Sequence, residues 1–167
     1  YSEVVKNFNV NLDKTNIGYV YTIPYYVSLI NCDTEYILNV ATDCMDVIFV
    51  DDNFILKSLD LFENNVNCLT TTIPWVPGNS LINGKTCGES EMLHYNLENF
   101  RDGDFLPNFG FSDQFFLSKT NLLKSINYNL SDTKMYHGPS YCNGICFEMK
   151  IVDYSWINQK FRFVYDK

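Results

Sequence analysis

Two aspartates follow the strongest strand pattern of the sequence and could bind a divalent cation. Residues 34–40 read TEYILNV, and their nearly all-apolar centre predicts a strand buried in a mostly parallel sheet. Asp43 and Asp46 come next, in a loop that leads to a predicted helix over residues 54–64. Carboxylates at the carboxyl end of a parallel strand lie where open α/β sheets bind ligands, and they can hold Mg²⁺ or Mn²⁺ against phosphate oxygens. We therefore expect a metal site at Asp43 and Asp46, with a helix-capping or loop carboxylate as the alternative for Asp43.

The other elements must place these carboxylates at the edge of a sheet. Besides residues 34–40, the apolar patterns predict strands over residues 4–10, 17–22, 66–73, 113–118 and 161–165. Helices are predicted over residues 24–32, 54–64, 120–125 and 141–159. Residues 75–107 read as irregular, and a loop of this length is uncommon unless it is functional. This order predicts one α/β domain over residues 1–167, with a sheet flanked by helices.

The composition limits the classes of partner. The chain has 20 Asp and Glu against 12 Lys and Arg, for a net charge of −8, and it lacks the Lys/Arg cluster that a nucleic acid would need. We therefore expect no nucleic-acid partner, although a divalent cation would let an acidic protein bind a nucleotide diphosphate. No apolar run approaches the length of a membrane span. The six cysteines lack zinc-like spacing, which is typical of free thiols in a reducing compartment and slightly favours the cytoplasm.

Several segments together resemble one family. Residues 34–45 (TEYILNVATDCM) are similar to the strand and metal-binding segment of family-2-like glycosyltransferases of the GT-A type, whose fold is Rossmann-like. The other similar segments are the helices on either side of that strand, an acceptor-side strand and a later segment, at residues 24–26, 53–65, 110–117 (GFSDQFFL) and 147–148. The matches run in the family's order over about residues 24–148, and this order is more specific than any single match.

The resemblance implies a GT-A-like domain that uses a nucleotide-sugar donor, a divalent cation and a hydroxyl-bearing acceptor, which could be a glycan, a protein or a lipid. The family's metal motif is Asp-x-Asp, and here Ala41 stands at its first position and Asp43, the direct metal ligand in such enzymes, at its second. The family begins with a strand–helix–strand unit that holds the nucleobase, and the residues before Pro24 are too few for it. Because the chain also starts at Tyr1 without a methionine, we expect this N-terminal nucleotide-binding unit to be truncated or degenerate, and the chain to be part of a longer protein with other domains.

The resemblance also implies roles for residues outside the metal motif. Asp113 would be the general base that removes a proton from the acceptor hydroxyl, the alternative being an exposed strand-end aspartate. His137 is a candidate third metal ligand, and Trp75 could stack on a sugar ring or instead plug the core. Glu148 could contact the acceptor or the same cation, or it could be a solvated residue of an amphipathic helix.

These observations favour two functions of different classes. The first is a metal-assisted glycosyltransferase that moves a sugar from a nucleotide-sugar donor to a hydroxyl acceptor. The second is a catalytically inactive glycosyltransferase-like module for binding or assembly within a larger protein, which Ala41 favours because it removes one motif aspartate. A third interpretation is an unrelated α/β or β-rich binding protein whose resemblance to the family is accidental. A structure without a helix between the predicted strands at residues 34–40 and 66–73 would support it.

Overall fold

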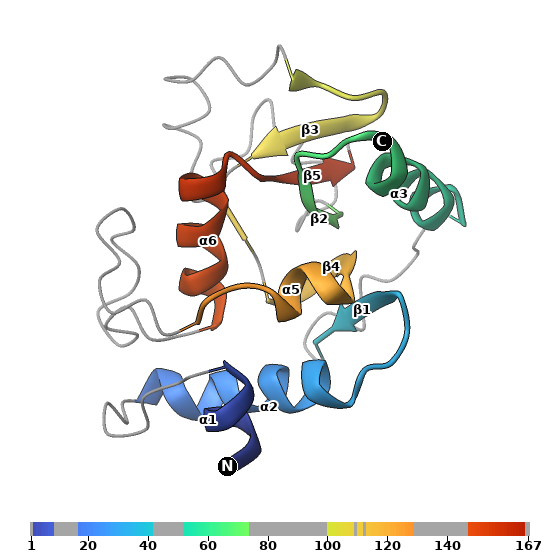
Figure 1. Ribbon diagram of the computed structural model, residues 1–167. Coiled ribbons are helices and arrows are strands. Elements are labelled where there is room, and N and C mark those ends of the chain that lie inside the picture. Colours follow the sequence, from blue (N-terminus) through green and yellow to red (C-terminus); the bar gives the residue numbers. More distant parts are fainter. Residues whose placement is uncertain are drawn as a thin grey trace.

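The computed structural model describes residues 2–8, 17–41, 52–73, 100–108, 110–111, 113–128 and 147–165 of the chain (Figure 1). The described helices are α1 (Ser2–Phe8), α2 (Ile17–Asn31), α3 (Asp52–Asn64), α5 (Thr120–Lys124) and α6 (Phe147–Asn158). The described strands are β1 (Tyr36–Val40), β2 (Cys68–Thr72), β3 (Phe105–Asn108), β4 (Phe115–Lys119) and β5 (Phe161–Tyr165). Among the described residues, none forms a helix that is both long and apolar enough to cross a membrane.

The five strands form one mixed sheet in the order β1-β4-β2-β5-β3. Only β2 and β5 pair in parallel, whereas β4 pairs antiparallel with both β1 and β2, and β3 pairs antiparallel with β5. The α/β class with flanking helices is therefore confirmed, but the prediction of a mostly parallel sheet is wrong. The apolar centre of β1 suggested a strand buried inside a parallel sheet, yet β1 is the outer strand of the described sheet, and Leu38 at its centre is 46% exposed.

The directions of the strands bring several strand ends to one edge of the sheet, where a site could lie. Because β4 is antiparallel to β1 and to β2, and β2 is parallel to β5, the strands β1, β2 and β5 all run in one direction. Their carboxyl ends therefore lie along the same edge of the sheet, together with the beginnings of β3 and β4. We call this the carboxyl edge, and it is the edge at which α/β sheets bind ligands.

Helices cover both faces of the sheet, and each face has its own apolar core (Figure 1). On one face α1, α2 and α6 pack over the sheet, and this α2–α6 cluster contains Val4, Phe8, Tyr26, Leu29, Leu69, Phe111, Phe116, Leu123, Ile126, Tyr128, Phe147, Ile151 and Val152. On the other face lies α3, and this α3 cluster contains Phe54, Leu61, Phe62, Cys68, Phe105, Phe115, Leu117, Phe161, Phe163 and Tyr165. Neighbours on β4 alternate between the two: Phe115 and Leu117 face α3, while Phe116 faces α2 and α6.

The first two predicted strands are helical, which corrects the sequence-based assignment over residues 4–10 and 17–22 as far as these residues are described. In α1 the buried residues are Val4 and Phe8, four positions apart on one helix face, with exposed Glu3, Lys6 and Asn7 around them. The same residues also alternate with period two, so the local pattern was compatible with a strand. The helix predicted from Pro24 begins earlier, at Ile17, and Pro24 lies inside it on the exposed side.

One strand was missed in the segment predicted to be irregular. Strand β3 contains Pro107 and follows a turn in which Gly103 has a φ of +55°, a conformation that favours glycine. Asp102 and Phe105 close this turn with two backbone hydrogen bonds of 3.1 and 2.9 Å. Proline is tolerated because β3 is the other outer strand of the described sheet and pairs only with β5.

Candidate carboxylate site

Of the five site residues predicted from the sequence, the structure describes Asp113. The other four, which are the predicted metal ligands and the predicted stacking residue, lie outside the described residues: Asp43, Asp46, Trp75 and His137. Their roles therefore stay predictions. Asp113 lies two residues before β4, at the carboxyl edge of the sheet, and it is half-buried rather than the exposed strand-end residue of the alternative interpretation.

Asp113 is held by side chains from two other elements. The Tyr25 hydroxyl, on α2, lies 3.1 Å from Oδ2 of Asp113 and donates to it, and it is 3.2 Å from the Asp113 carbonyl oxygen. The Asn39 side chain, on β1, donates to the same carbonyl oxygen at 2.6 Å. These contacts fix both the backbone and the carboxylate of Asp113 relative to α2 and β1.

The end of β1 is joined to the same segment. The backbone amide of Ala41 donates to the carbonyl oxygen of Gln114 at 2.6 Å, which continues the pairing of β1 with β4. Ala41 occupies the first position of the segment that resembles a metal motif, and Asp43 follows two residues later in the chain. The structure therefore brings the start of the metal-like segment next to the segment that carries Asp113, although about 70 residues separate them in the sequence.

Aromatic stacking positions Tyr25 and the start of α6. The Tyr25 ring stacks on the Phe147 ring with a centroid distance of 4.9 Å and an interplanar angle of 6°. Phe147 also lies parallel to Tyr128, at 5.6 Å and 9°, and edge-on to Tyr26 at 5.7 Å. Because Phe147 is 1% exposed and its neighbours hold it from several sides, the first turn of α6 has a defined place beside Tyr25.

Glu148 follows Phe147 in that first turn and faces the same region. Burial raises the pKa of Glu148 from its ordinary 4.5 to about 7; the negative charge of Asp113 adds to the increase, and Arg162 opposes it. The sequence pattern left open whether Glu148 is simply a solvated helix residue, and its half-buried position next to a second carboxylate argues against that. A carboxyl group with a pKa near 7 can exchange a proton at neutral pH.

Arg162 is the basic group of the site, and sequence reasoning missed it. It lies on β5 between Phe161 and Phe163, is only 7% exposed, and faces away from the α3 cluster. A Cβ atom on Gly110 would lie 3.1 Å from the Arg162 Nη2 atom and 3.1 Å from the Asn108 Oδ1 atom, so the glycine leaves room for both groups. The Asn108 side chain accepts the Gly110 amide at 2.6 Å. A charged residue inside an otherwise apolar strand (FRFVY) was the available signal.

The arrangement is suited to proton transfer. The Asp113 carboxylate at the carboxyl edge accepts a hydrogen bond from the Tyr25 hydroxyl, and the half-buried Glu148 carboxyl interacts electrostatically with Asp113 and with the buried Arg162 guanidinium. A half-buried carboxyl group with a pKa near 7, beside a second carboxylate, is typical of acid–base sites. Within the described part of the chain, no group of three His, Cys, Asp or Glu side chains could hold a metal ion, and the predicted metal ligands lie outside that part.

Comparisons of the chain with protein-family models, with curated proteins and with solved structures find no match.

Proposed function

We propose that this chain is a glycosyltransferase domain of the GT-A type, which transfers a sugar from a nucleotide-sugar donor to a hydroxyl acceptor with the help of Mn²⁺ or Mg²⁺. One observation carries the proposal: separate segments that resemble this family meet at one place. Ala41 contacts Gln114, Tyr25 contacts Asp113, and Glu148 interacts electrostatically with Asp113. An accidental resemblance gives no reason for these segments to converge. In addition, α3 follows β1 and precedes β2 in the chain, so the missing helix that would have supported an accidental resemblance is not observed.

The proposed chemistry uses the two carboxylates on the acceptor side. A carboxylate of the Asp113–Glu148 pair takes the proton from the acceptor hydroxyl, and the acceptor oxygen forms a bond to the anomeric carbon of the donor sugar. The bond between that carbon and the phosphate oxygen breaks, and the nucleoside diphosphate leaves with the bonding electron pair. A cation held by Asp43, with Asp46 and His137 as further ligands, would stabilise the charge of the leaving diphosphate. Trp75 would stack on a sugar ring.

Ala41 is compatible with this proposal because of the way its backbone is used. Its amide continues the β1–β4 pairing through Gln114, a contact that any residue other than proline can make. The missing motif carboxylate therefore leaves this end of β1 intact and removes one expected contact to the cation and the nucleotide. The proposal depends on Asp43 as the ligand that remains.

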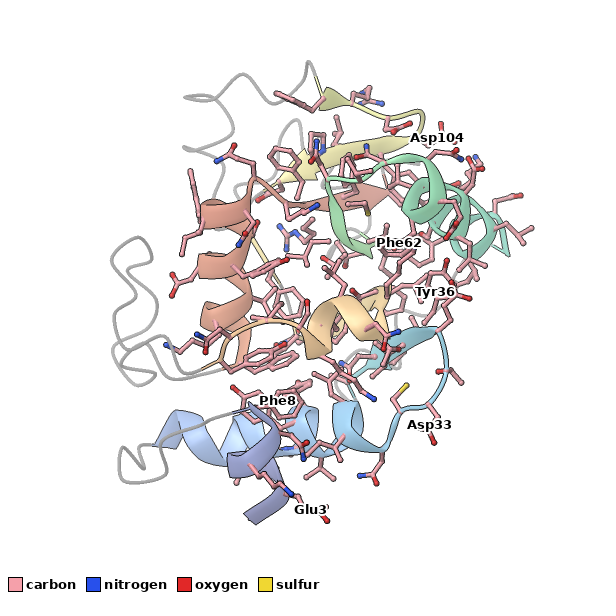
Figure 2. All side chains as sticks on the ribbon, viewed as in Figure 1. Glu3, Phe8, Asp33, Tyr36, Phe62 and Asp104 are labelled. Carbon is pink, nitrogen blue, oxygen red and sulfur yellow. The ribbon has the colours of Figure 1, made fainter. Side chains whose placement is uncertain are left out.

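Thermal-shift measurements with UDP-sugars and GDP-sugars, with and without Mn²⁺, test donor binding. A donor at about 100 times its Kd adds about 2.7 kcal/mol to the stability of the folded chain, so the melting temperature should rise by several degrees. We expect Asp43→Ala to abolish the Mn²⁺-dependent part of the shift. Asp33→Ala is the matched control, because Asp33 is an exposed aspartate in the turn before β1 (Figure 2). If no donor produces a shift in the wild-type chain, the proposal fails.

The second candidate is a catalytically inactive module that binds or assembles within a larger protein. The replacement of the first motif aspartate by Ala41 favours it, because one expected contact to the cation and the nucleotide is then missing. A chain that binds donors but never releases nucleoside diphosphate would support this function over the enzyme. Its Glu148→Gln variant would then bind donors as the wild type does.

A further inference from the structure

We infer that the two carboxylates of the site have different tasks: Asp113 stays an anion held by Tyr25, and Glu148 is the group that takes up and releases the proton. As a statement about catalysis this rests on the proposed function, whereas the division between the two groups can be measured without any substrate. It differs from the prediction made from the sequence, in which Asp113 was the base.

A hydrogen bond from the Tyr25 hydroxyl stabilises the charged form of the Asp113 carboxylate. The Tyr25 hydroxyl donates to Oδ2 at 3.1 Å, and a donor on a carboxylate oxygen favours ionisation. Tyr25 cannot easily move away, because its ring is stacked on Phe147. The carbonyl of Asp113 is fixed in turn by Asn39. Asp113 is therefore a positioned anion beside Glu148.

The surroundings of Glu148 favour its protonated form instead. Its side chain is half-buried at the start of α6, where desolvation is the largest influence on its pKa. The charged and titratable groups that face it are Asp113 from the segment before β4, Arg162 from β5, and the Tyr25 hydroxyl from α2, which is engaged with Asp113. Desolvation and the Asp113 anion favour the protonated form of Glu148, while Arg162 limits this effect. Glu148 can thus exist in both forms near neutral pH.

In the proposed reaction, the proton of the acceptor hydroxyl moves to a carboxylate oxygen of Glu148 as the acceptor oxygen bonds to the anomeric carbon. The negative charge of Asp113 makes Glu148 a stronger base than a half-buried glutamate alone, because the pair is most favourable when it carries one proton. Glu148 is then the catalytic residue, and Tyr25 is a positioning residue that acts through Asp113.

Carboxyl ¹³C NMR titration of the full chain, with labelled glutamate, tests directly whether Glu148 is the carboxyl group that takes up and releases the proton. We expect one glutamate carboxyl to titrate near pH 7, and this signal to be absent from Glu148→Gln. In Asp113→Asn the midpoint should move to lower pH, since a negative neighbour has been removed. Glu3→Gln, which changes an exposed glutamate of α1, is the control and should leave the midpoint unchanged. A Glu148 midpoint at about 4.5, or one that Asp113→Asn does not move, overturns the inference.

The catalytic role is tested by the pH dependence of kcat/KM with a donor that binds. The wild-type rate should rise with pH through about 7, because the base must be ionised, and Glu148→Gln should lose about a hundredfold or more in kcat and lose this rise. Tyr25→Phe keeps the ring on Phe147 but removes the hydroxyl, so it should lower kcat and alter the pH profile with little change in KM. If Glu148→Gln keeps full turnover, the inference fails while the proposed function stands. If no donor binds, the proposed function fails, and the NMR titration still decides the division.

Discussion

The two faces of the sheet bury different kinds of side chain. Among the described residues, the α3 cluster consists of phenylalanine, leucine, tyrosine and one cysteine, and two ion pairs, Lys57–Asp104 and Lys119–Glu63, lie at its rim. Tyr36 and Phe62 pack against each other there, as Figure 2 shows, with ring centroids 5.7 Å apart. The α2–α6 side instead buries the charged residues themselves, namely Lys150 and Asp153 on α6 and Arg162 on β5.

This difference indicates that the two faces of the sheet have different roles, one in stability and the other in chemistry. Charged groups at a solvated rim cost little, whereas a charge inside the protein must be compensated by partners or by protonation. Asp153 illustrates the cost: it is 5% exposed, its Oδ2 atom has no hydrogen-bond partner in the described part of the chain, and burial raises its pKa. The α2–α6 face, which buries these charged groups, also carries Glu148 and Arg162. We interpret the α3 face as the stabilising half of the domain and the α2–α6 face as the half that is adapted to a site.

The largest expected effect is on the α3 face. Phe54 is 0% exposed and contacts the rings of Phe105, Phe115 and Tyr165. Phe54→Ala should lower the free energy of unfolding by about 3–5 kcal/mol, measured by urea denaturation, because it removes a ring from a packed core. The NMR midpoint of Glu148 should not change at urea concentrations where the variant is folded. A loss below about 1 kcal/mol would show that this face is not the stabilising half.

A smaller effect of opposite sign is expected from Glu148→Gln. Because the pKa of Glu148 is raised to about 7 in the folded chain, its stabilising contribution is fully present below about pH 4.5 and is lost as the pH rises through about 7. Glutamine is neutral at every pH, so the variant should be more stable than the wild type at pH 8 by about 1–3 kcal/mol and similar to it at pH 4. Urea denaturation at both pH values measures this. A variant that is less stable at pH 8 would contradict the account.

Two glycines offer a matched comparison between the faces. The added methyl group of Gly110→Ala would lie too close to the side chains of Arg162 and Asn108. This variant should lower the free energy of unfolding by about 1–3 kcal/mol and also shift the pH at which Glu148 titrates. Gly103→Ala meets no atom within 4 Å but must adopt a positive φ, so it should cost about 1–2 kcal/mol without affecting Glu148. Denaturation curves and NMR titrations of both variants separate these outcomes. If Glu148 titrates at the same pH in Gly110→Ala and in Gly103→Ala, then Arg162 does not influence Glu148 and is not part of the site.

The smallest effect is expected at the rim of the α3 face. Lys57 forms an ion pair with Asp104 and lies 3.4 Å from the Tyr165 hydroxyl, but its side chain is still 40% exposed to solvent. Solvated ion pairs of this kind contribute little to stability, and the contribution falls further with salt. Lys57→Met should therefore change the urea midpoint by no more than the error of the fit, at both low and high salt. A large, salt-sensitive loss would mean that the rim charges stabilise this face after all.

Much of the fold could be predicted from local patterns. The helical pattern of residues 54–64 matches α3, whose apolar face is buried, and the largely apolar residues 161–165 match β5, which is buried on both faces. Strand order and direction could not be predicted, because the chain alone does not show that β4 inserts between β1 and β2. Residues 4–8 were misassigned since Val4 and Phe8 fit both a period of two and a helix face.

The site was predictable in part. Asp113 and Glu148 were identified as candidates by their sequence context, but their proximity depends on how α6 packs beside the segment before β4. Tyr25 was part of a matching segment without a role of its own, and its hydrogen bond to Asp113 spans 88 positions of the chain. No local pattern predicts such a contact. The raised pKa of Glu148 likewise arises from burial and from a neighbour that is distant in the sequence.

The central claim is that the edge carrying Asp113 and Glu148 transfers sugar from a nucleotide-sugar donor. Release of nucleoside diphosphate from UDP-sugars and GDP-sugars in the presence of Mn²⁺ tests it most directly, with the full chain and its Asp113→Asn and Glu148→Gln variants measured side by side. We predict release by the wild-type chain with at least one donor, and a loss of about a hundredfold or more in Glu148→Gln. Absence of release with every donor, or equal release by all three proteins, would contradict it.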